Sequence, residues 1–209
     1  MKKSLLLGIV SLAVGVASSY GQGFVVLDNY NFPGGLITYG ANVPQNGVSG
    51  AFGSNGTGIL GGWTVGLYWS LSTGLSDSAG NALPGAGLSL GVGNAANGAT
   101  VPDAFSSTAV AGQFFAGNPF NVPGSASGQT VSLEVIAYDS AAASYASAAF
   151  RGHSAVFTIV TQSGTAPIPT ANVGPLFTTF SVTPVPEPTT IALAGLGGLS
   201  LLLFRRKQA

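Results

Sequence analysis

The chain has 209 residues, of which only 6% are charged, and its formal net charge is zero. Five of the six cations lie within a few residues of the two chain ends, so residues 22–184 carry one cation, Arg151, against five carboxylates. Such a segment has no basic surface to neutralise phosphates, which excludes nucleic-acid binding. The absence of cysteine excludes disulfide bonds and thiol chemistry.

Residues 1–21 have the pattern of a secretory signal peptide, the substrate of signal peptidase. The cationic start Met1–Ser4 precedes the apolar run Leu5–Val16 and a group of small residues. Cleavage after Ser19 and cleavage after Gly21 both fit the small-residue pattern, and we expect the second. The alternative is a retained N-terminal anchor, which the shortness of the apolar run disfavours.

Residues 22–184 contain short apolar runs separated by turns rich in Gly, Asn and Pro, the pattern of a β protein. The strongest strand patterns are Trp63–Leu71 and Thr130–Tyr138, which are rich in β-branched and aromatic residues. Further strands are expected at Phe24–Leu27, Leu36–Tyr39, Leu88–Leu90, Val110–Phe115, Phe120–Val122, Ser154–Thr161 and Leu176–Thr183. Over Ala141–Ala149 a short helix competes with a loop, and Pro184 is expected to begin an exposed tether.

Strand periodicity predicts which side chains share a face. In Trp63–Leu71 the odd positions, which include Trp63 and Trp69, are large and apolar and are expected to form core. The even positions, which include Tyr68, are small or amphipathic and are expected to be exposed or lightly covered. In Thr130–Tyr138 the valines and Leu133 share one face.

Seven or eight strands without a long helical period or a fixed repeat predict an all-β fold, as a single β-sandwich or jelly-roll-like domain over residues 22–184. About 160 residues suffice for one hydrophobic core. The alternative, a disordered secreted linker, is disfavoured by the regular aromatic and β-branched strands.

No set of catalytic residues is evident. His153 is the only histidine, and a lone histidine is more often a surface or hydrogen-bonded residue than a base or a ligand. Glycoside hydrolysis needs two facing carboxylates, but Glu134 and Asp139 are an odd number of residues apart and should lie on opposite faces of a strand. No zinc or calcium motif occurs. We therefore expect no enzyme activity, catalytic residues, metal or cofactor.

A glycan-binding site would need exposed aromatic rings. The candidates are Tyr30, Tyr39, Trp63, Tyr68 and Trp69. Both tryptophans are expected in the core, which makes Tyr68 on the opposite face the better candidate glycan contact.

The last 25 residues form three blocks in fixed order. Val185, Pro186, Glu187 and Pro188 should stay extended, because closely spaced prolines disfavour a helix. Residues 189–204 are uncharged and, as a helix, would measure roughly 24 Å, enough to serve as a short transmembrane helix. The basic end is expected to stay on the cytoplasmic side and to stop transfer; it consists of Arg205, Arg206 and Lys207. The alternative is that Ile191–Phe204 is a buried helix of a soluble core.

This tail, with Pro186-Glu187-Pro188 before a hydrophobic run and a basic end, resembles the PEP-CTERM sorting domain of bacteria. The resemblance covers only residues 185–209. It implies an exosortase-like membrane enzyme as partner, processing near the motif, and transfer to the cell surface, often in association with exopolysaccharide. The precursor would be a single-pass inner-membrane protein with residues 22–184 outside the cytoplasm.

Three hypotheses for residues 22–184 follow. The first is a non-enzymatic structural or adhesive protein of the envelope or exopolysaccharide matrix. The second is a carbohydrate-binding module-like protein for exopolysaccharide, and the third, the least supported, is a polysaccharide hydrolase.

Overall fold

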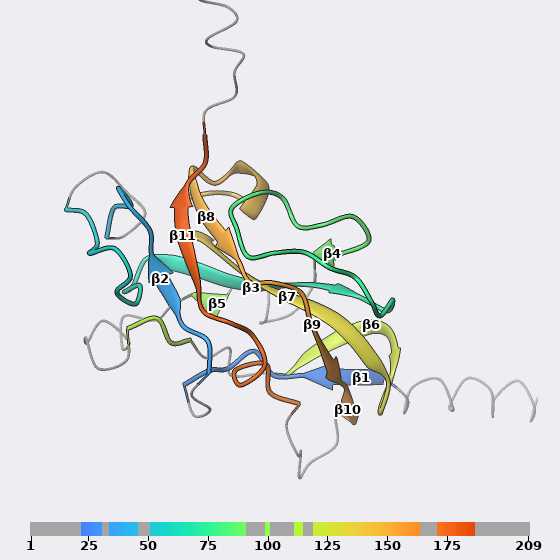
Figure 1. Cartoon of the computed structure of the whole chain (residues 1–209). Coiled ribbons are helices and arrows are strands. Elements are labelled where there is room, and N and C mark those ends of the chain that lie inside the picture. The colour runs from blue at the N-terminus through green and yellow to red at the C-terminus, as the bar shows by residue number, and fades with distance from the viewer. Residues whose placement is uncertain are drawn as a thin grey trace, which may run out of the picture.

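The computed structural model describes residues 22–30, 34–45, 51–90, 99–100, 111–114, 119–163 and 171–186 (Figure 1). The expected signal peptide and the tail from residue 187 onwards, which includes Glu187 and Pro188 of the motif, lie outside the described residues. Within the described part of the chain, no helix is both long enough and apolar enough to cross a membrane.

The predicted all-β class is confirmed. The strands are β1 (Gln22–Val25), β2 (Ile37–Tyr39), β3 (Trp63–Ser70), β4 (Ser89–Leu90), β5 (Ala99–Thr100), β6 (Phe120–Ala126), β7 (Thr130–Asp139), β8 (Phe150–His153), β9 (Phe157–Val160), β10 (Gln162–Ser163) and β11 (Phe180–Pro184). Among the described residues, the helical element is the short 3₁₀ helix η2 (Tyr145–Ser147), whose N-terminus has a capping box formed by Ser144. It lies within Ala141–Ala149, where either a short helix or a loop was expected.

The strands form two sheets. In the larger sheet the order is β2-β11-β8-β7-β3-β4, with β5 also pairing with β3 and β9 with β7. The smaller sheet has the order β10-β1-β6. The chain changes sheet several times, and the two shortest of these crossings are the β6–β7 turn and Thr161, between β9 and β10 (Figure 1). The long antiparallel pair β3–β7 runs from Trp63 opposite Asp139 to Ser70 opposite Ser132 and forms the centre of the larger sheet.

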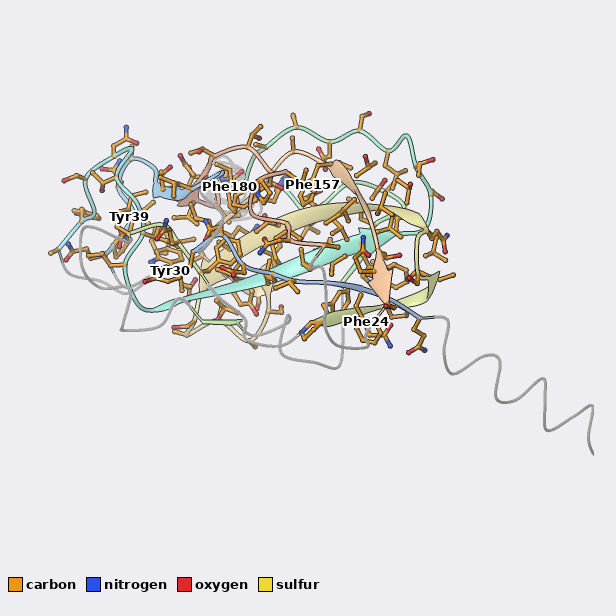
Figure 2. All side chains as sticks on the ribbon, turned by 90° about the horizontal axis from the view of Figure 1, so that it is seen from below. Phe24, Tyr30, Tyr39, Phe157 and Phe180 are labelled. Atoms are coloured by element: carbon orange, nitrogen blue, oxygen red, sulfur yellow. The ribbon has the colours of Figure 1, made fainter. Side chains whose placement is uncertain are left out.

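The odd positions of β3 lie in the core, as their periodicity predicts, but Leu71, which was expected to share that face, follows the end of the strand and is 39% exposed. Trp63 is completely buried, its ring edge-to-face with Tyr39 at 6.2 Å, and its Nε1 donates to the Gln45 carbonyl. Trp69 is half-buried and packs against the same core. Core side chains come from both sheets. In Figure 2, Tyr39 lies towards one end of the described domain and Phe24 towards the other.

The even positions of Trp63–Leu71 were predicted to be exposed or lightly covered, but Thr64, Gly66 and Ser70 are buried. On the same face of the sheet, Tyr68 is half-buried, and Glu134 and Ile136 on β7 are buried. The loop between β3 and β4 lies over this face (Figure 1), where Ser132 Oγ donates to the carbonyl of Ser72. Periodicity predicts which residues share a face, but it cannot predict that a Gly-, Ser- and Ala-rich loop will cover that face.

Several strand boundaries also differ from prediction. β8 was not predicted, because Phe150–His153 lacks a β-branched pattern and becomes a strand only through pairing with β7 and β11. The pairs formed by β5 and β10 are only two residues long. Residues 111–114 form no strand, and the remainder of the predicted strand Val110–Phe115 lies outside the described residues.

Candidate functional site

The covered face of the larger sheet brings together three ionisable side chains from distant parts of the sequence. Glu134 lies on β7, and His153 at the end of β8 is paired with Ile136, so the two side chains are diagonal neighbours on one face. The β3–β4 loop supplies Asp77: Gly80 and His153 exchange backbone hydrogen bonds of 3.1 and 2.7 Å, and the Asp77 carbonyl accepts from the Val156 N–H. Backbone pairing therefore holds the loop over the histidine.

The three side chains are close and mostly buried. Glu134 is 0% exposed and His153 1% exposed, whereas Asp77 is half-buried. One ligand-type atom from each residue lies within 4.8 Å of the other two. His153 Nδ1 lies 2.9 Å from Glu134 Oε1 and 3.0 Å from the Ser154 carbonyl oxygen. Because both neighbours of Nδ1 are oxygen acceptors, Nδ1 carries the proton when no other ion is present.

Burial and neighbouring charge change the acidity of this pair. Burial raises the pKa of Glu134; His153 opposes this effect and Asp77 adds to it. Burial lowers the pKa of His153, but the Glu134 carboxylate, the Ser154 carbonyl and Asp77 outweigh it, and the net pKa is raised. The pair therefore retains a proton more strongly than either group would in water.

Hydrogen bonds within this cluster are incomplete. Nδ1 is aligned with the Ser154 carbonyl, so its contact with Glu134 Oε1 is electrostatic rather than a well-aligned hydrogen bond. Three buried atoms of the cluster have no hydrogen-bond partner among the residues that the structure describes: both carboxylate oxygens of Glu134 and Nε2 of His153. Burying carboxylate oxygens without hydrogen-bond donors costs folding free energy, so the cluster calls for an explanation beyond packing.

The only cation of residues 22–184 does not compensate these carboxylates by a hydrogen bond. Arg151 Nε donates to the Asn81 carbonyl, and Nη1 donates to the carbonyls of Tyr145 and Ala146. Its guanidinium also lies over the Tyr145 ring, with the central carbon 5.1 Å from the ring centre. Arg151 therefore serves as a structural connector between β8, η2 and the covering loop.

The candidate glycan contact Tyr68 lies on this same covered face. Its ring is half-buried and packs edge-to-face against Tyr145 at 6.2 Å, so it does not form an exposed stacking platform. Tyr39 and Trp63 are buried, whereas Tyr30 is 46% exposed. A separate hollow of about 490 Å³ is bordered by the hydroxyl and amide side chains of Ser54, Thr57, Gln45 and Gln113, beside Tyr39.

Sequence reasoning did not find the Asp77–Glu134–His153 cluster. Glu134 was compared with Asp139, which pairs opposite Trp63 at the far end of β7, where its Oδ2 accepts from the Phe150 N–H at 3.5 Å. The three clustered residues are separated by tens of positions and carry no spacing motif. One indication of this site was present in the sequence: Glu134 lies at an even position of Thr130–Tyr138, on the face opposite the apolar odd positions.

The sorting motif begins directly at the folded domain. Pro184 was expected to start an exposed tether; it is exposed, but it is the last residue of β11 and pairs with Phe150 on β8. Its carbonyl accepts from Asn81 Nδ2 at 2.8 Å, and the Val185 N–H donates to the Ala149 carbonyl at 2.8 Å. The prediction of a tether failed because proline lacks an N–H donor but can still accept hydrogen bonds at a strand end.

A sorting signal that follows the last strand of the domain implies an exported, membrane-sorted protein. The family model of the PEP-CTERM protein-sorting motif matches residues 184–207, so this chain carries a PEP-CTERM sorting tail, as its residues indicated. The motif implies processing by exosortase, a membrane enzyme. Comparison with curated proteins and with solved structures gave no significant match.

Proposed function

We propose that the chain is delivered by its PEP-CTERM tail to the cell surface or exopolysaccharide matrix, where the β domain has a structural or adhesive role without enzyme activity. The observation that carries this proposal is the direct continuation of β11 into the sorting tail. β11 pairs in parallel with β2 and in antiparallel with β8, so the tail leaves from a strand bonded on both sides. The described part of the chain therefore enters the motif from a strand of the larger sheet.

The buried cluster supports a non-enzymatic role. A retaining glycosidase places its two carboxyl groups roughly 5–5.5 Å apart and an inverting one further apart, with room for a sugar between them. Here ligand-type oxygens of Asp77 and Glu134 lie within 4.8 Å of each other, and Glu134 is completely buried. A polymer substrate cannot reach a carboxylate in that position, which disfavours the hydrolase hypothesis.

The test is the mass and envelope location of the mature protein in its native host. Wild type is compared with the double variant Pro186→Ala/Glu187→Ala and with the matched control Lys207→Arg, which keeps the charge of the basic end. We expect wild type and Lys207→Arg to lose both the first 21 residues or so and the hydrophobic tail, as the signal-peptide pattern and the sorting motif predict. The double variant should remain in the inner membrane at higher mass.

A wild-type product that keeps its tail and fractionates with the double variant would contradict this proposal. The protein would then be a single-span membrane protein with an external β domain.

Carbohydrate binding is the second candidate, and the hollow beside Tyr39 favours it. The amide of Gln113 and the hydroxyl of Ser54 can supply directional hydrogen bonds to a sugar. An exopolysaccharide binding assay with the mature protein tests this role, and Gln113→Ala should weaken binding while leaving surface sorting unchanged. Equal retention of wild type and Gln113→Ala by the polysaccharide would exclude this hollow as the binding site.

A further inference from the structure

We propose that Asp77, Glu134 and His153 form a binding site for one divalent transition-metal ion, with Zn²⁺ as the best-fitting member of that class. This inference goes beyond sorting and rests on a separate observation: a cluster in which both oxygens of the buried Glu134 carboxylate lack a hydrogen-bond donor among the described residues. The three residues join the β3–β4 loop to β7 and β8.

The spacing fits ligands of one ion. Ligand atoms that each lie about 2.0–2.2 Å from a zinc ion are roughly 3–3.5 Å apart. His153 Nδ1 and Glu134 Oε1 are already 2.9 Å apart, and an Asp77 oxygen lies within 4.8 Å of its two partners. Asp77 is half-buried on a loop, so a small movement of its side chain would complete the set and leave a route of entry for the ion.

The missing hydrogen bonds of Glu134 and His153 also indicate a bound cation. Both oxygens of Glu134 are buried and lack a hydrogen-bond donor among the described residues, as does Nε2 of His153. Even when His153 is protonated, two carboxylates leave this cluster with a net negative charge. Arg151 is committed to backbone carbonyls. A divalent ion would supply the missing positive charge and bond the carboxylate oxygens directly.

The donor set selects the kind of metal. One imidazole nitrogen with two carboxylates suits Zn²⁺ and related first-row ions, whereas Ca²⁺ and Mg²⁺ prefer oxygen ligands throughout. Binding of the ion at Nδ1 would displace the Nδ1 proton, so the ion would take the place of the N–H that lies 3.0 Å from the Ser154 carbonyl oxygen. A bound metal would hold the β3–β4 loop against β7 and β8 of the larger sheet.

The experiment uses the full chain, purified in detergent and stripped of metal with a chelator. Calorimetric titration with Zn²⁺, and Tm measured with Zn²⁺ or with EDTA, are compared for wild type and for Asp77→Asn, Glu134→Gln and Asp139→Asn. Asp139→Asn is the matched control, because it removes one buried carboxylate charge from the same strand outside the cluster.

We expect wild type to bind one Zn²⁺ and to gain roughly 5–10 °C in Tm when free Zn²⁺ is about a hundred times its Kd. Asp77→Asn and Glu134→Gln should lose that gain, whereas Asp139→Asn should keep it, and Ca²⁺ should produce none. Co²⁺ should give a visible d–d absorption in wild type that Asp77→Asn lacks.

Failure of wild type to bind Zn²⁺, or wild-type affinity in Asp77→Asn, would overturn the metal site. Should Glu134→Gln fail to fold, Asp77→Asn decides the question, because Asp77 is only half-buried. These outcomes are independent of tail processing, so failure of the metal site leaves the proposed sorting role untouched.

Discussion

Arg151 both stacks on Tyr145 and binds its backbone: the guanidinium carbon lies 5.1 Å from the centre of the tyrosine ring, and Nη1 donates to the Tyr145 carbonyl at 3.0 Å. The same guanidinium reaches the carbonyls of Ala146 and Asn81, each at 2.8 Å. One side chain therefore connects the covering loop and η2 to β8.

Arg151→Lys should lower the free energy of unfolding by about 1–3 kcal/mol, because a single ammonium cannot reproduce the planar fork and leaves buried carbonyls without donors. Urea denaturation measures the change. Tyr145→Phe keeps the stacked ring and removes only the hydroxyl that donates to the Ala82 carbonyl, so its effect should be smaller, about 0.5–1.5 kcal/mol. Equal stability of Arg151→Lys and wild type would show that the three carbonyls do not depend on this side chain.

Gly152→Ala should destabilise the junction between β8 and β11. An added Cβ would lie 2.3 Å from the backbone carbonyl oxygen of Ser181, an atom that moves only if the strand moves. We expect a loss of about 1–3 kcal/mol, as for other overpacked positions.

Gly80→Ala is the matched control, because its Cβ would meet the nearest atom, His153 Nε2, at an ordinary 3.6 Å. It should change stability by no more than about 0.5 kcal/mol. Thermal and urea unfolding of both variants compare the two positions, and a Gly152→Ala protein as stable as Gly80→Ala would refute the close approach of β8 and β11.

Tyr39 should contribute to loss of stability in alkali. Burial raises the pKa of its hydroxyl, which donates to the Gln45 carbonyl, although the Leu60 N–H and Trp63 oppose the shift. Above about pH 10 the unfolded tyrosine loses its proton while the folded one keeps it. The native state then binds more protons than the unfolded state, so the free energy of unfolding falls as pH rises.

Urea unfolding at about pH 8 and about pH 11 should therefore show a smaller alkaline loss for Tyr39→Phe than for wild type. The loss should persist in part, because burial also raises the pKa of Tyr68, Tyr138 and Tyr145. An identical loss in both proteins would mean that Tyr39 titrates equally in the folded and unfolded states.

Features that depend on local order were predictable from the sequence. The tail was recognisable because Pro186, Glu187 and Pro188, the uncharged run and the basic end follow one another along the chain, without any need for folding. The alternation in Trp63–Leu71 and Thr130–Tyr138 likewise predicted the two central strands and their apolar faces, since strand periodicity is a local property.

What covers the other face was decided only by the tertiary structure. Asp77, Glu134 and His153 meet because the loop after β3 folds back across β7 and its Gly80 pairs with the end of β8. Pro184 is part of β11 because it pairs with Phe150 on β8. Such contacts join residues far apart in the chain, and single-residue patterns contain no information about which distant segments will pair. The sequence by itself therefore determined the sorting tail, the β class and the core face, whereas chain folding determined the buried ionisable cluster and the point where the tail leaves the domain.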